Sequence, residues 1–80
     1  MKSTKIKLSK NTQANYILAK EDNEYSVICI EESSNNCSIE IYKATHITKD
    51  KALAKKMFKK ITKGKVYGIT LLDVIYNLLE

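Results

Sequence analysis

The chain has 80 residues, of which 44% are hydrophobic, and it contains two cysteines, two glycines, no proline and no tryptophan. This length and composition predict one small globular domain over residues 1–80 and argue against a disordered chain. The sequence shows no apolar run as long as a signal peptide core or a membrane span, so we expect a cytoplasmic location.

Charge is distributed unevenly along the chain. All fourteen positive charges are lysines and the net charge is +5, but residues 21–42 carry six acids and no lysine, whereas residues 43–65 carry nine lysines and one aspartate. An acidic middle and a basic following segment attract each other within one domain, although surface ion pairs contribute little free energy. The charge balance alone therefore does not identify a partner.

The first half of the chain has the pattern of short strands separated by turns. Residues 1–10 alternate weakly at Ile6 and Leu8, and we expect residues 1–12 to form either a flexible arm or a fourth, N-terminal edge strand. Apolar runs follow at residues 14–20, 25–32 and 37–45, and the polar clusters between them are typical of turns. The pattern predicts a three-stranded antiparallel meander.

Tight hairpins at both turns would assign the side chains of this meander to two faces. Pairing Glu21 with Glu24 and Glu32 with Cys37 places isoleucines opposite one another, because side chains alternate along a strand. One face then carries Ile17, Ile28, Ile30, Ile39 and Ile41, and the other carries Tyr16, Leu18, Tyr25, Val27, Cys29 and Tyr42. We expect the isoleucine-bearing face to pack against a helix.

The element that would cover this face is an amphipathic helix over residues 48–64. Thr48 is its expected N-cap, and Gly64 is its expected left-handed C-terminal residue. The helical period groups apolar residues on one arc and lysines on the other. The apolar arc contains Leu53, Ala54, Met57, Phe58 and Ile61, and the basic arc contains Lys51, Lys55, Lys56, Lys59, Lys60 and Lys63.

A second helix is predicted over residues 71–79. Thr70 and Asp73 have the spacing of a capping box at its start. Its apolar stripe is wider than a surface helix needs, so we expect it to be well buried against the rest of the domain or against another chain. The sequence therefore predicts an α+β domain in which two C-terminal helices pack on the sheet.

This element order carries a resemblance to a known family. Strand, strand, strand and basic helix are followed by the pattern V-x-x-(I/V)-x-L-x-D-V-I, present here as Val66, Ile69, Leu71, Asp73, Val74 and Ile75. Over roughly residues 14–80 the chain resembles the uncharacterised clostridial-type family catalogued as domain of unknown function 6514. Tyr67 and Gly68 stand where that pattern is expected to have a proline. The resemblance implies no activity, cofactor or site residue.

Catalytic and metal-binding chemistry finds little support in the sequence. His46 is the single histidine, and nothing in its spacing pairs it with a cysteine nucleophile. The expected hairpin register places Cys29 and Cys37 on opposite faces and too far apart for a shared metal ion or a disulfide, which favours free thiols. We therefore expect a non-enzymatic protein without cofactor or metal.

Three kinds of partner remain as hypotheses. The first is another protein, for which this chain would be a small regulator or inhibitor, with a homodimer as the intermediate case. The tyrosine-bearing face supports this reading, because aromatic side chains are enriched at interfaces. Its alternative is that the C-terminal helix covers that face, which makes it part of the core. The predicted partner-binding residues are Tyr16, Leu18, Tyr25, Val27 and Tyr42.

The second hypothesis is nucleic acid, bound by lysines of the predicted helix and tyrosines of the sheet. Against it, the two features should lie on opposite sides if the helix packs on the isoleucines. The third is a membrane surface, which ranks below the others because the sheet competes for the same apolar stripe. The candidate nucleic-acid-binding residues are Lys51, Lys55, Lys56, Lys59, Lys60 and Lys63.

Overall fold

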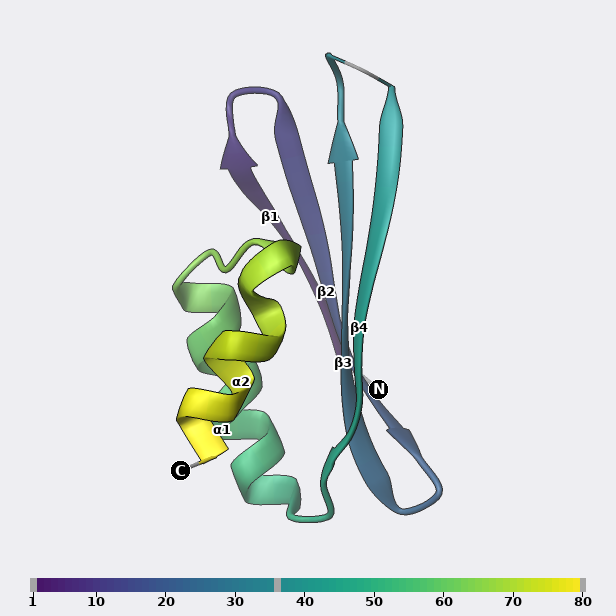
Figure 1. Cartoon of the computed structure of the whole chain (residues 1–80), viewed down its shortest axis with the longest axis vertical. Helices are drawn as coiled ribbons and strands as arrows, with labels where there is room; N and C mark the ends of the chain where they lie inside the picture. Colours follow the sequence, from purple (N-terminus) through teal and green to yellow (C-terminus); the bar gives the residue numbers. More distant parts are fainter. Residues whose placement is uncertain (1, 36, 80) are drawn as a thin grey trace.

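A computed structural model describes residues 2–35 and 37–79 of the chain. It is an α+β fold, in which an antiparallel sheet of strand order β1-β2-β3-β4 is followed by two helices (Figure 1). The predicted fold class is confirmed, but the count of three strands is wrong by one. The elements are β1 (Lys2–Ser9), β2 (Thr12–Glu21), β3 (Glu24–Ser33), β4 (Ser38–Thr48), α1 (Lys51–Lys63), the 3-10 helix η1 (Gly68–Thr70) and α2 (Leu71–Leu79).

The fourth strand is β1, which pairs with β2 along one edge of the sheet. Of the two alternatives for the N-terminal segment, the structure therefore has the edge strand. The weak alternation at Ile6 and Leu8 has a simple cause, because these two side chains pack partly buried against the core. Lysines occupy three of the six other positions in the strand and hide its period in the sequence.

The hairpins β2–β3 and β3–β4 differ in how their observed registers compare with the predicted ones. Between β2 and β3, Asp22 and Asn23 take positive φ values of 53° and 67°. This conformation makes the tight two-residue turn that matches the twist of a hairpin. The predicted pairs Glu21–Glu24 and Ile17–Ile28 are confirmed.

The register between β3 and β4 is shifted by two residues from the predicted one. Ser33 pairs with Ser38, and Ile30 therefore lies opposite Ile41 rather than Ile39. Because a shift by two residues keeps every side chain on its own face, the grouping of the isoleucines survives this error. The isoleucine face, as we call it, consists of Ile17, Ile28, Ile30, Ile39 and Ile41.

Helix α1 begins and ends at other residues than predicted. Its N-cap is Asp50, whose carboxylate accepts hydrogen bonds from the backbone amides of Ala52 at 2.9 Å and Leu53 at 3.2 Å. Thr48 does not cap the helix; its hydroxyl accepts a hydrogen bond from the backbone amide of Asp50, just before α1. Gly64 has a φ of −83°, so the prediction of a left-handed glycine is wrong there.

Helix α2 has the predicted bounds, but its start is built differently. The chain enters α2 directly from η1, and the Thr70 hydroxyl donates to the Tyr67 carbonyl at 3.1 Å instead of capping α2 with Asp73. Leu71 and Ile75 are buried, whereas Leu72 and Tyr76 remain exposed. The wide apolar stripe of α2 is thus only partly covered within one chain.

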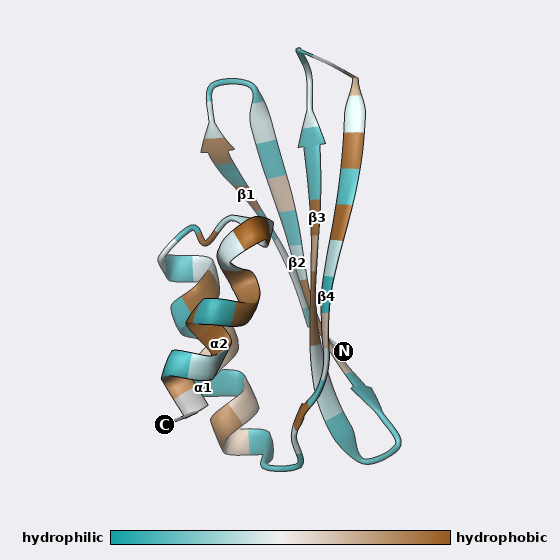
Figure 2. Cartoon of the chain, viewed as in Figure 1, coloured by the Kyte–Doolittle hydropathy of each residue, from teal (hydrophilic) through white to brown (hydrophobic). Residues whose placement is uncertain are grey.

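Both helices cover the same side of the sheet (Figure 1), and it is the tyrosine-bearing side. The prediction that the isoleucine face packs against a helix is therefore wrong. The buried residues of α1 are Ala54, Met57, Phe58 and Ile61. Figure 2 shows apolar bands along β4. The core consists of Ala14, Tyr16, Leu18, Val27, Cys29, Ala44, Ala54, Met57, Phe58, Ile61, Leu71 and Ile75.

Strand β4 contains a bulge near its end, on the way to the helices that cover the tyrosine-bearing side. Val27 pairs with Ala44 but Tyr25 pairs with Thr48, so β4 contains extra residues that lack a partner on β3. His46, within this bulge, has a φ of 53°, and its amide donates to the buried Ser26 hydroxyl at 3.3 Å. Bulges bend the strand that carries them. Here β4 curves toward the helix side and leads into α1 (Figure 1).

Candidate functional site

The residues predicted to bind a partner do not form an exposed patch. Tyr16, Leu18 and Val27 are buried beneath the helices, where a second protein does not reach them, and Tyr25 and Tyr42 are partly buried against the same core. The sequence left two alternatives for the tyrosine-bearing side, and the structure has the one in which a C-terminal helix covers it. These five residues therefore do not make up one exposed surface for a protein partner.

Tyr16 fastens the connection between the helices to the sheet. Its hydroxyl donates to the Val66 carbonyl over 2.6 Å, across 50 positions of the chain. Burial raises the pKa of Tyr16 well above its usual range, with the negative groups of Cys29 and Glu31 adding to the effect. The phenol therefore stays neutral and can keep this hydrogen bond at physiological pH.

Two further hydrogen bonds lie where η1 begins beside the sheet, one joining η1 to β3 and one within β4. The Gly68 amide donates to the Glu31 carboxylate, and the Tyr42 hydroxyl donates to the Glu40 carboxylate. That hydrogen bond is the main reason why the pKa of Tyr42 rises to about 12. Each of these polar groups is engaged with another part of the same chain, so we assign the set a structural role.

The two cysteines occupy different environments and are both free. Cys29 is buried in β3, and its pKa rises to about 11, mainly because burial disfavours the thiolate and further because Glu31 is near. A thiol that stays protonated is a poor nucleophile. Cys37 is exposed, and His46 faces Glu24, with 3.8 Å between Nδ1 and the carboxylate.

Within residues 2–35 and 37–79, no three histidine, cysteine, aspartate or glutamate side chains are grouped so that they could hold a metal ion. The same part of the chain contains no helix that is both long and apolar enough to cross a membrane. The apolar stripe of α1, which the membrane hypothesis requires to be exposed, packs on the sheet instead, since Met57, Phe58 and Ile61 are buried there.

The isoleucine face is the apolar surface that both helices leave uncovered. Ile17, Ile28 and Ile30 are partly buried by their strand neighbours, whereas Ile39 and Ile41 expose 66% and 67% of their surface. Parity along β1 places Lys5 and Lys7 on the same side of the sheet, because they pair with the outward-facing Asn15 and Gln13. The result is an apolar surface with a basic border along one edge.

A second apolar region runs along the free edge of β4, where the sheet meets η1 and α2. Its exposed members on the helix side are Ile69, Leu72 and Tyr76, which expose 79%, 50% and 64% of their surface. A hollow of about 310 Å³ lies between β4 and η1, and another of about 150 Å³ lies between β4 and α2. This region was not predicted from the sequence, although the wide apolar stripe of residues 71–79 was a signal for it.

The six lysines of α1 are all exposed, as the nucleic-acid hypothesis requires. These lysines and the tyrosines lie on the same side of the sheet, because α1 packs on the tyrosine-bearing side. A hollow of about 490 Å³ is lined by Leu18, Tyr25 and four lysines. The Nζ of Lys20 lies 5.8 Å from the centre of the Tyr25 ring. The other lysines of this basic hollow are Lys2, Lys51 and Lys55.

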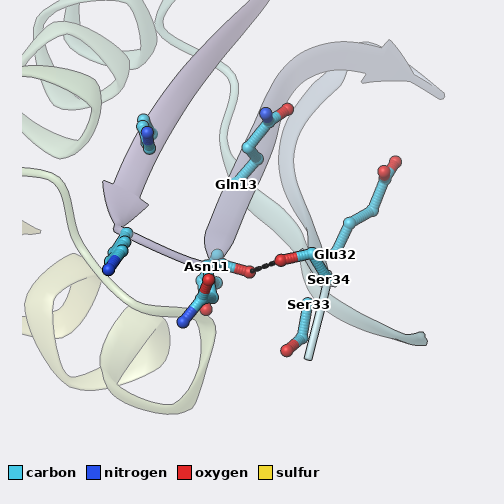
Figure 3. A pocket seen from close by; sticks show the side chains of 8 residues that line it. Asn11, Gln13, Glu32, Ser33 and Ser34 are labelled. Atoms are coloured by element: carbon cyan, nitrogen blue, oxygen red, sulfur yellow. Dashed lines mark hydrogen bonds between the residues drawn. The ribbon is translucent and has the colours of Figure 1, made fainter. Parts of the chain in front are cut away.

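A further hollow, of about 230 Å³, lies at the opposite end of the sheet. Figure 3 shows the side chains that line it. The turn after β1 and the end of β3 line it with polar side chains, among them Gln13 and Glu32. A hydrogen bond of 3.3 Å from the Ser34 hydroxyl to the Asn11 carbonyl joins the two hairpins there. This arrangement fits a solvated junction between turns.

Comparison with known proteins gives no relative: no family model, no curated protein and no solved structure matches the chain. The resemblance to domain of unknown function 6514 stays a prediction.

Proposed function

We propose that this chain is a non-catalytic protein-interaction module, a small regulator or inhibitor that binds another protein through its isoleucine face. The observation that carries the proposal is the uncovered side of the sheet, where five isoleucines from three neighbouring strands lie together. Contiguous apolar surface on a small domain is costly to leave in water and marks interaction sites. Continuous strand pairing makes this surface rigid, so binding needs little reordering.

The border of the isoleucine face indicates the chemistry of the partner. Lys5 and Lys7 flank the isoleucines on β1, and Lys43 lies among them on β4. A complementary surface would present apolar side chains surrounded by carboxylates, because opposite charges at the rim steer association. Lys43 is already paired with Glu21, at 3.6 Å. The β1 lysines therefore remain as the principal contacts for an acidic rim.

The test is affinity capture from a lysate of the source cells, with and without nuclease and at two salt concentrations. The double variant Ile28→Thr/Ile30→Thr puts two hydroxyls at the centre of the isoleucine face and keeps β-branched side chains in the strand. We expect it to lose the captured protein and to keep the circular dichroism spectrum of the fold.

The matched control is Ile69→Thr, the same exchange at an isoleucine that is 79% exposed on the helix side. It should retain the partner. Equal capture by the double variant and the unmodified chain would refute binding through the isoleucine face.

A second candidate function is binding of single-stranded nucleic acid, and the basic hollow is the observation in its favour. Tyr25 offers a partly exposed ring for stacking, and four lysines surround it to contact phosphates. Lys51→Gln/Lys55→Gln should weaken binding of an oligonucleotide and lower its salt dependence by roughly 0.7 per lost phosphate contact. Fluorescence anisotropy measures both quantities.

The control for this titration is Lys59→Gln/Lys63→Gln, which removes two lysines of the same helix that do not line the hollow. A change confined to the first pair would locate the strand in the hollow. An equal change in both pairs would indicate unspecific attraction to α1, and a lack of binding at low salt would remove this candidate.

A further inference from the structure

The two edges of the sheet differ in how they are protected. An edge strand exposes unpaired backbone groups, and lysines along it prevent pairing with another chain. Strand β1 carries Lys2, Lys5 and Lys7 and no acid. Antiparallel pairing of two such strands would bring ammonium groups together, so β1 is guarded against a second copy.

Strand β4 lacks this protection. Between Ser38 and Ala44 it carries one acid, Glu40, and one base, Lys43, so this part of the edge is neutral. Ile39 and Ile41 project from one side of it, each about two-thirds exposed. A strand added at this edge would therefore meet no net charge.

The helix side of the same edge offers apolar surface as well. The two hollows beside β4 are lined by η1 and α2, and Ile69, Leu72 and Tyr76 form their exposed rim. A strand placed here has Ile39 and Ile41 beside it on one side of the sheet and apolar residues of η1 and α2 on the other. Edge pairing gives such a strand backbone hydrogen bonds in addition.

We infer that the occupant is β4 of a second copy of this chain, which runs antiparallel about a two-fold axis at Ile41. A strand and its two-fold copy are antiparallel by symmetry, and the two-fold dimer is the commonest assembly of identical chains. Ile41 is the middle residue of the stretch 38–44, which pairs with β3 in uninterrupted register. The inference does not depend on the proposed function of the isoleucine face.

The register about Ile41 agrees with the charges of the edge. In antiparallel pairing about Ile41, the numbers of two opposite residues sum to twice 41. Glu40 therefore lies opposite Tyr42 of the second copy, and Lys43 lies opposite Ile39 of the second copy. Neither charged side chain directly faces its own kind. The same rotation brings the exposed Leu72 and Tyr76 of α2 toward their counterparts, which completes the helix layer. The sheet then continues through both copies.

Cysteine crosslinking tests this geometry. Opposite residues of antiparallel strands have Cα atoms about 4.5–5.5 Å apart, within the range of a disulfide. In a Cys37→Ser background, Ile41→Cys should give covalent dimer as the main product of mild oxidation at micromolar concentration. The matched control is Lys5→Cys in the middle of β1, which should stay largely monomeric. The buried Cys29 remains in both variants.

Light scattering on the unmodified chain supplies a test without crosslinking. The expected mass is twice the 9.1 kDa of the monomer. Leu72→Asp, at a half-exposed position of α2, should reduce it to the monomer value while the circular dichroism spectrum is retained. A monomeric mass of the unmodified chain at every concentration would overturn the inference, and so would equal crosslinking of the Ile41→Cys and Lys5→Cys variants.

Discussion

Leu18→Ala is expected to lower the free energy of unfolding by about 2–5 kcal/mol, whereas Ile17→Ala should lower it by only about 1 kcal/mol. Leu18 is 5% exposed and lies in the core beneath the helices. Removing its side chain leaves a cavity that the packed helices cannot fill. Ile17 is the next residue of the same strand, but it belongs to the isoleucine face, where water already reaches it.

Urea unfolding followed by circular dichroism measures both variants, and an unchanged denaturant slope shows that the two states are comparable. The pair is informative because both residues belong to β2 and differ mainly in the side of the sheet on which they lie. A greater loss for Ile17→Ala than for Leu18→Ala would mean that the helices cover the isoleucine face.

Gly68→Ala is expected to destabilise the fold by about 1–3 kcal/mol, the usual cost of forcing an extra carbon into a packed site. A Cβ built on Gly68 would lie 1.9 Å from the Tyr42 ring, so the ring or the backbone has to move. Movement would also disturb the hydrogen bond from the Gly68 amide to Glu31. Thermal unfolding should show a lower midpoint for this variant.

Gly64→Ala is the matched control, with the same change at the chain's other glycine. Gly64 has a φ of −83°, which alanine adopts without strain. A Cβ built on Gly64 would lie 3.1 Å from the Lys60 carbonyl oxygen, its nearest neighbour. Alanine also restricts the unfolded chain, which offsets part of that tight contact. A loss as large as that of Gly68→Ala would show that the Tyr42 contact is not the cause.

Several features of the fold were predictable because their causes are local. The turn at Asp22 and Asn23 fixes the pairing of β2 with β3, since both residue types tolerate positive φ. The period of the α1 residues indicated the helix and its buried arc, and the end of α2 was predicted at Leu79. By contrast, two side-chain oxygens only two residues apart, those of Thr48 and Asp50, compete for the N-cap of α1, and the prediction of Thr48 was wrong.

The candidate surfaces were harder to predict than the elements. The isoleucine face was identified as a group of residues, but it was assigned to the core, whereas the tyrosine-bearing side was assigned to a partner. Both sides of the strands are apolar, so alternation alone does not distinguish them. The free edge of β4 and the basic hollow were missed because each joins segments far apart in the chain, such as Ile41 with Leu72 and Tyr25 with Lys55.

The sequence by itself determined the order of the elements and which side chains share a face, because strand alternation and helical period are properties of neighbouring residues. Only the tertiary structure decided which face became the core. That choice depends on contacts between distant segments, namely the bulge that bends β4 toward α1 and the hydrogen bond from Tyr16 to Val66. Such contacts leave no periodic signal in the chain, so the pattern of the strands does not reveal that the isoleucines face the solvent.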